Sequence, residues 1–179
     1  MDTLKTYYTV FFIVFGAMFL QAQAVGDSTL KAAQFDCKIT QTKEKLQNKY
    51  FVTTQNLQLR ANNEKFVYAV MQLGKRGHHI FMYIRIIDKN VCIKKDQILE
   101  IQYISGETVS YKNDYSVNCD GIFVRKFDKK ELKKISENEM IAIKIYTYQK
   151  NYEFLVSNTL NYDINNQIHC LAAYRIKSM

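Results

Sequence analysis

Four cysteines, spread along the chain behind an apolar N-terminal segment, place the tightest constraint on how this sequence can fold. They are Cys37, Cys92, Cys119 and Cys170. An even number of cysteines in an exported chain favours disulfide bonds, and each bond limits which strands can be neighbours. Three pairings are possible, and the sequence alone does not choose among them.

The first 24 residues have the three parts of a secretory signal peptide. Lys5 lies in a short head, an apolar run covers residues 10–20, and the triplet Ala22-Gln23-Ala24 follows it. The run is too short for a membrane anchor, because a bilayer crossing needs about 20 residues. We therefore expect cleavage near Ala24, no transmembrane anchor after cleavage, and a secreted or periplasmic protein. Residues 25–179 would then form a single globular domain.

The charge balance limits the classes of partner. The chain has a formal net charge of +8, and only five of its 25 basic residues are arginine. Because bidentate recognition of phosphates and bases favours the guanidinium group, this lysine-rich balance argues against specific nucleic-acid binding. It leaves an unknown protein or an anionic polymer of the cell envelope as the expected partner.

Most of the domain has the β-branched and aromatic composition of strands. The runs 66–73 and 80–88 flank the hairpin loop GKRGHH, and they predict central strands because both of their faces are apolar. The other expected strands cover residues 37–42, 49–59, 140–148 and 152–156, together with the two arms of a hairpin between Cys92 and Cys119.

Two helices are predicted after Cys119. Asp128 and Glu131 form a capping-box pattern at the start of a short helix over residues 129–135. Ser157 can cap a C-terminal helix whose apolar stripe recurs at helical spacing. The stripe consists of Leu160, Ile164, Ile168 and Leu171. These elements predict an α+β fold: a mainly antiparallel curved sheet or half-barrel of about eight strands, a short inserted helix, and an amphipathic C-terminal helix.

The hairpin between Cys92 and Cys119 is the most patterned segment. A three-residue loop at Ser105-Gly106-Glu107 places apolar side chains on one face, with Ile101 opposite Tyr111. In this register the two cysteines miss direct pairing by one residue. A disulfide between them therefore requires a single β-bulge.

The cysteines also allow a second disulfide, and they raise two reactive alternatives, a zinc site and a nucleophilic pair. A bond between Cys37 and Cys170 would close nearly the whole domain. A zinc site is disfavoured because the chain lacks C-x-x-C spacing. A nucleophilic pair is also disfavoured, because His169 and Cys170 diverge by roughly 100° on a helix.

No other pattern predicts a catalytic, metal or cofactor site. The adjacent His78 and His79 would point to opposite faces of a strand, so one metal ion could not easily bind both. The chain has neither a glycine-rich phosphate loop nor a serine elbow. A catalytic pair of carboxylates that only the fold brings together is an alternative that the sequence does not decide.

One cationic cluster is a candidate anion-binding patch for a glycan, a lipid headgroup or an acidic partner. Its members are Arg125, Lys126, Lys129, Lys130, Lys133 and Lys134. The alternative interpretation is a solvated short helix whose cations match the helix dipole.

Residues 35–172 resemble an uncharacterised family of small exported bacterial proteins in the order of their features. The resemblance rests on CKITQT, CIKKDQILEIQYISGETVSYKN, NCDG and KKELKKISENEMIAIKIYTYQKNYEF. Family members carry an acidic, glycine-containing turn after the first strand, where this chain has KEKLQN. The resemblance implies export and an α+β domain, and it supplies no active residues.

The leading hypothesis is a non-enzymatic binding or interaction module at the cell envelope or outside the cell. One alternative is a hydrolase that acts on an envelope or extracellular polymer. A weaker alternative is a secreted toxin, inhibitor or immunity-type partner. A concave pocket with converged histidine or carboxylate side chains would favour the hydrolase, whereas an open aromatic or basic face would favour the binding module.

Overall fold

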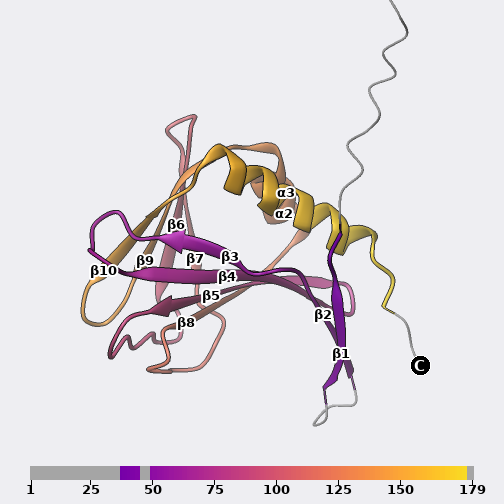
Figure 1. Ribbon diagram of the computed structural model, residues 1–179, viewed down its shortest axis with the longest axis horizontal. Helices are drawn as coiled ribbons and strands as arrows, with labels where there is room; N and C mark the ends of the chain where they lie inside the picture. Colours follow the sequence, from indigo (N-terminus) through magenta and orange to yellow (C-terminus); the bar gives the residue numbers. More distant parts are fainter. Residues whose placement is uncertain (1–36, 45–48, 177–179) are drawn as a thin grey trace, which may run out of the picture. The chain divides into compact units, whose positions relative to one another are not determined.

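The computed structural model describes residues 37–44 and 49–176, which belong to one compact unit. The predicted signal peptide and most of the KEKLQN turn lie outside the described residues. The described part contains ten strands and two helices (Figure 1). They are β1 (Thr40–Glu44), β2 (Lys49–Thr53), β3 (Leu57–Arg60), β4 (Tyr68–Arg76), β5 (His79–Ile87), β6 (Ile98–Tyr103), β7 (Thr108–Lys112), β8 (Ile122–Phe127), α2 (Lys129–Glu137), β9 (Met140–Tyr146), β10 (Asn151–Leu155) and α3 (Asn158–Ala173).

The larger sheet, sheet A, has the strand order β1-β2-β4-β5-β8, and all of its pairs are antiparallel. β2 and β3 both pair with β4, at opposite ends of that strand. The expected strand over residues 49–59 is therefore interrupted at residues 54–56, where the Thr54 side chain hydrogen-bonds to the carbonyl of Leu73. The prediction that β4 and β5 are central strands is confirmed.

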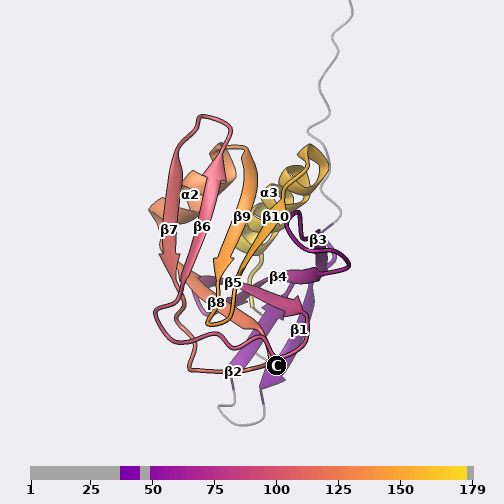
Figure 2. The same ribbon diagram turned by 90° about the vertical axis from the view of Figure 1, so that its left-hand side faces the viewer.

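The smaller sheet, sheet B, has the antiparallel order β10-β9-β6-β7, and Figure 2 shows its strands side by side. A bridge between Ala61 and Phe154 links the two sheets at one edge. At another edge, the Asp114 N–H donates to the Val124 carbonyl at 2.8 Å. The sheets are not closed into a barrel, so the prediction of one curved sheet with about eight strands is replaced by two sheets.

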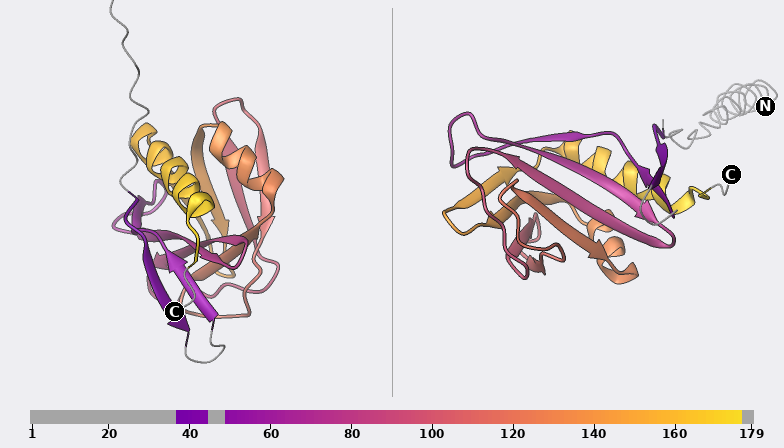
Figure 3. Two further views of the ribbon diagram at one scale, coloured as in Figure 1. Left: turned by 90° about the vertical axis from the view of Figure 1, so that its right-hand side faces the viewer. Right: turned by 90° about the horizontal axis from the view of Figure 1, so that it is seen from below.

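A single hydrophobic core fills the space between the inner faces of the two sheets and the helices. Phe123, Ile143 and Phe154 are fully buried in it. α3 contributes the expected stripe, in which Ile164, Ile168 and Leu171 are buried and Leu160 packs against the core. Figure 3 shows α3 on one side of the β4–β5 pair, so the helix covers only the inner face of sheet A.

Both predicted helix starts are confirmed. The Asp128 side chain accepts a hydrogen bond from the Glu131 N–H at 2.8 Å, and Glu131 accepts one from the Asp128 N–H at 2.7 Å. The Ser157 side chain accepts from the Leu160 N–H at the start of α3. These contacts satisfy backbone donors that have no partner within the first turn of a helix.

Two disulfides join Cys37 to Cys170 and Cys92 to Cys119. The predicted bulge is present next to the second bond. The β6–β7 ladder pairs Ile98 with Lys112, but further along the bridge pairs Ile93 with Asn118. The second arm therefore holds one more residue than the first between these pairs, which brings the two cysteines opposite each other.

The predicted register of this hairpin is wrong by two residues, although the predicted faces are correct. Ile101 pairs with Val109 rather than Tyr111. The loop consists of residues 104–106, and Gly106 occupies its last position with φ +84°. Glycine is favoured at that position because it adopts positive φ without a steric penalty. A shift of two residues preserves the side on which each side chain lies, so face matching could not detect it.

Candidate functional site

The outer face of sheet A is the strongest candidate for a functional surface. Along β5, even-numbered residues from Ile80 to Ile86 point into the core, and odd-numbered residues point outward. These outward residues are partly or fully exposed and include Phe81, Tyr83 and Arg85. The second apolar face that the sequence shows in β4 and β5 is thus covered by no described helix (Figure 3).

An aromatic cluster lies at the centre of this face. The Phe51 and Tyr83 rings meet edge to face with centroids 5.8 Å apart, and Phe81 lies 6.1 Å from Tyr83. The Arg76 guanidinium lies over the Phe51 ring at 5.7 Å. Gly74 permits this arrangement, because a Cβ at that position would lie 2.5 Å from Phe51 Cζ. The cluster combines three rings and a cation, an arrangement that suits contact with a partner.

A shallow groove of about 650 Å³ runs beside the cluster. Its lining combines the ring faces with aliphatic side chains, neutral hydrogen-bonding groups and two arginines. The outward-facing members are Thr42, Phe51, Asn56, Val70, Gln72, Arg76, Tyr83, Arg85, Ile87 and Ile122. The described lining contains neither a carboxylate nor a histidine, so this groove has no acid–base pair to offer.

Over β3, β4, β5 and β8, the charged residues at outward positions on this face are cations. The register places Arg60, Arg76, Arg85 and Lys126 at outward positions. Across β3, β4, β5 and β8, no outward position holds Asp or Glu. Sheet B differs, because Lys144 on its outer face lies between Glu100 and Glu153 on the neighbouring strands. An anionic partner would therefore be attracted to sheet A rather than to sheet B.

A second cavity, of about 860 Å³, lies at the end of β4 beside the residues that follow α3. Arg76 lines both this cavity and the groove. Tyr174 and Arg175 also line it, and the described lining contains no Asp or Glu.

Lys75 lines this cavity, and backbone carbonyls at the end of α3 bind its ammonium group. Its ammonium donates to the carbonyls of Leu171 at 2.6 Å and Tyr174 at 2.8 Å. Burial lowers the pKa of Lys75. The ammonium offsets the negative end of the α3 dipole, so Lys75 stabilises the C-terminal end of this helix.

The structure does not bring the predicted cationic cluster together as one patch. Arg125 points inward from β8 and pairs with Asp114 and Glu131 at 3.3 and 2.6 Å. Lys133 pairs with Glu137, and Lys134 pairs with Glu107.

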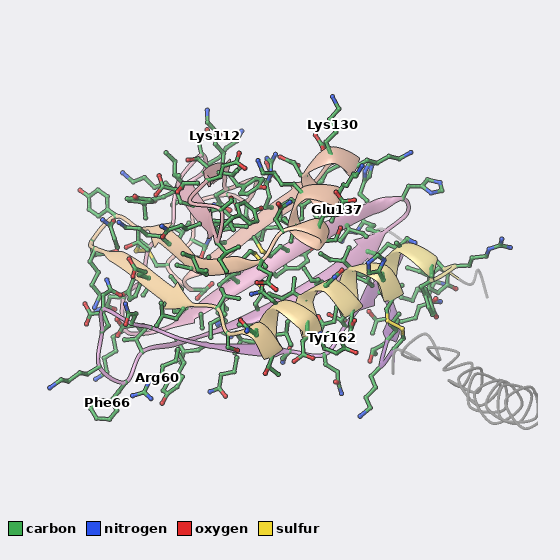
Figure 4. All side chains as sticks on the ribbon, turned by 90° about the horizontal axis from the view of Figure 1, so that it is seen from above. Arg60, Phe66, Lys112, Lys130, Glu137 and Tyr162 are labelled. Atoms are coloured by element: carbon green, nitrogen blue, oxygen red, sulfur yellow. A yellow bond between two sulfur atoms is a disulfide. The ribbon has the colours of Figure 1, made fainter. Side chains whose placement is uncertain are left out.

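The other three cations of the cluster lie in two different places. Lys126 projects from the outer face of sheet A, opposite Phe81. Lys129 and Lys130 are exposed on α2, and Figure 4 shows Lys130 extending away from the protein. The six residues therefore belong to separate surfaces.

The other candidate residues also lie apart. His78 and His79 are exposed at the β4–β5 turn, and His169 is exposed on α3. All four cysteines are in disulfides. Among the described residues, no group of three His, Cys, Asp or Glu side chains could hold a metal ion. No described helix is both long and apolar enough to cross a membrane.

A hydrogen-bonded and ion-paired network joins the end of β5 in sheet A to β10 in sheet B. The Asp88 carboxylate accepts a hydrogen bond from the Tyr152 hydroxyl at 2.8 Å. It also forms an ion pair with the Lys150 ammonium at 3.1 Å. The Tyr152 hydrogen bond is the main reason that the pKa of Asp88 is lowered. Burial raises the pKa of Tyr152 to about 12. Because each member has a partner in the fold, the network is structural.

Sequence reasoning did not single out the outer face of sheet A. The alternation in HIFMYIRII contained the signal, since its odd positions carry two rings and an arginine. The apolar second face was instead interpreted as a sign of burial. Phe51 and Arg76 come from other strands, so only the sheet register places them beside Tyr83.

Comparison with known proteins identifies no relative. No protein-family model matches the chain. Neither curated proteins nor solved structures give a match. The resemblance to exported bacterial proteins therefore stays a prediction.

Proposed function

We propose that this protein is an exported, non-enzymatic binding module that holds an anionic polymer on the outer face of sheet A. The observation that carries the proposal is the combination of a three-ring cluster, a groove and outward cations, without an outward carboxylate on β3, β4, β5 or β8. Binding surfaces are enriched in aromatic residues and arginine.

Two further features support this function. The disulfides suit an oxidising compartment, as does the predicted signal peptide. The groove offers stacking, hydrogen bonding and positive charge, while its described lining holds no pair of groups that could exchange a proton with a substrate. Binding is therefore favoured over hydrolysis.

The experiment measures binding of the oxidised protein to polygalacturonate, dextran sulfate and neutral dextran by isothermal titration calorimetry. We expect binding to one or both polyanions that weakens as NaCl rises, because salt screens exposed charges. Neutral dextran should bind far more weakly. If neither polyanion binds at low salt, or if neutral dextran binds equally well, the proposal fails.

Two matched variants locate the site. Arg85→Gln removes a cation from the outer face of sheet A, and Lys112→Gln removes one from β7 in sheet B. Both side chains are exposed, and Figure 4 shows Lys112 extending into solvent. Only Arg85→Gln should weaken binding, by about three- to fivefold. Equal effects of the two variants would contradict a site on sheet A.

A further inference from the structure

The loop between β3 and β4, residues 61–67, exposes an aromatic ring that the hydrophobic core does not use. Phe66 is 84% exposed, although the next residue, Val67, is buried. Figure 4 shows Phe66 and Arg60 projecting at the same end of the protein. A phenylalanine usually stabilises a protein through burial, and at this position it does not.

The backbone at Phe66 is strained as well. Its φ is +63°, which lies in the left-handed region. Glycine, asparagine and aspartate adopt this conformation most easily, whereas a bulky side chain has a steric penalty there. Strain of this kind persists only where the surrounding structure holds it, and it is most frequent at functional sites.

Contacts with β10 hold the loop in place. The Asn62 N–H donates to the Glu153 carbonyl at 2.7 Å, and the Asn62 side chain donates to the Glu153 carboxylate at 3.1 Å. The Asn63 side chain donates to the Asn151 carbonyl at 2.9 Å. The polar half of the loop is therefore attached to sheet B, while the Phe66 ring extends into solvent.

The charges beside the ring favour an anionic partner. Arg60 ends β3 and Lys65 precedes the phenylalanine, and both are exposed. Neither of them forms an ion pair with any residue that the structure describes. The carboxylates of Glu64 and Asp88, in contrast, each lie 3.1 Å from the Lys150 ammonium. An apolar ring between two unpaired cations suits a surface in which hydrocarbon lies beneath a layer of negative charge.

A lipid bilayer fits these features better than a protein surface does. An ordinary protein interface buries about 800 Å² on each partner, and a phenylalanine side chain supplies only about 200 Å² of that area. A bilayer needs no matching surface. The inserted ring is buried, and each adjacent lysine or arginine adds attraction to anionic headgroups.

From this we infer that the loop at residues 61–67 is a membrane-contact element. The Phe66 ring inserts into the surface of an anionic bilayer, and Arg60 and Lys65 bind its headgroups. This inference goes beyond the proposed function, because it uses the loop after β3 rather than the groove and needs no polymer.

The first test follows fluorescence with lipid vesicles in the absence of polymer. The chain contains no tryptophan, so Phe66→Trp introduces a single tryptophan fluorophore in the loop. Its emission should shift to the blue with phosphatidylglycerol vesicles and not with phosphatidylcholine vesicles. Tyr162→Trp is the matched control, since Tyr162 is 54% exposed on α3, and it should show no shift.

The second test measures sedimentation with the same vesicles. Phe66→Asn removes the ring and tolerates the left-handed conformation. It should lower the partition coefficient for phosphatidylglycerol vesicles about tenfold without lowering the midpoint of urea unfolding. Lys65→Gln should lower the partition coefficient by about three- to fivefold. Added NaCl should weaken binding of the wild type.

Several results would overturn the inference. It fails if phosphatidylglycerol vesicles do not bind at low salt, or if phosphatidylcholine vesicles bind equally well. It also fails if Phe66→Asn binds as tightly as the wild type, or if that variant lowers the urea midpoint, because the ring would then stabilise the fold. A dimer that Phe66→Asn converts to a monomer would show that a second copy covers the ring.

The polymer assay separates this inference from the proposed function. Phe66→Asn should leave the affinity for polygalacturonate and dextran sulfate unchanged. If it weakens polyanion binding as much as vesicle binding, the loop belongs to the polymer site and the membrane inference is wrong. If polyanions do not bind but the vesicle results hold, only the proposed function fails.

Discussion

Removal of the Cys37–Cys170 disulfide should destabilise the protein more than removal of the Cys92–Cys119 disulfide. The two bonds join residues separated by 133 and 27 positions. A crosslink stabilises a protein mainly by restricting the unfolded chain, and the chain-entropy model gives about 5 kcal/mol for the longer loop and about 3.6 kcal/mol for the shorter one. The expected difference in the free energy of unfolding is therefore about 1.4 kcal/mol.

The measurement is urea unfolding at equilibrium of the Cys37→Ala/Cys170→Ala and Cys92→Ala/Cys119→Ala variants, monitored by circular dichroism. Cys170 is 7% exposed, so its replacement also removes packing. To measure this packing contribution separately, each variant is also compared with the wild-type protein in reductant. Both disulfides of the wild type are then reduced, so the remaining difference in the free energy of unfolding comes from the replaced side chains.

A larger loss from the Cys92–Cys119 variant would refute the loop-length argument. Equal losses would also count against it. Either result would mean that the unfolded chain keeps structure, for example a residual β6–β7 hairpin, or that native-state contacts around the bonds dominate their effect.

Two further predictions concern the binding face and the network between the sheets. Gly74→Ala should displace the Phe51 ring and weaken polyanion binding, while the free energy of unfolding changes by less than about 1 kcal/mol. Calorimetry would measure the affinity and urea unfolding the stability. Unchanged affinity would contradict the role of the ring cluster. Because the pKa of Asp88 is lowered in the folded protein, its contribution to stability is present above about pH 5 and is lost as the pH falls through the folded-state pKa. Tyr152→Phe should therefore be less stable at pH 7 and lose less stability between pH 5 and pH 2 than the wild type, and parallel stability curves would disprove the coupling.

Local structure followed closely from the sequence. The capping box at Asp128, the cap at Ser157 and the apolar stripe of α3 depend on residues a few positions apart, so they can be recognised without a fold. The same holds for the sidedness of the β6–β7 hairpin, because alternation depends only on the chain's own period of two.

The alternation of side chains did not by itself determine the register of that hairpin. Pairing Ile101 with Tyr111 or with Val109 gives the same faces, and the conformation of Gly106 decides between them. Turn chemistry would have favoured the correct register, since it places glycine last in the loop.

The sequence by itself determined the strand-rich α+β class, the two helices and their caps, and the requirement for a bulge if Cys92 and Cys119 are bonded. Only the tertiary structure decided that the strands form two sheets, which cysteines pair, and which apolar face is left uncovered. It also decided that Phe51, Arg76 and Tyr83 meet on three different strands. The physical reason is that helix caps and strand alternation arise from neighbouring residues, whereas a binding face depends on pairing between strands that are distant in the chain.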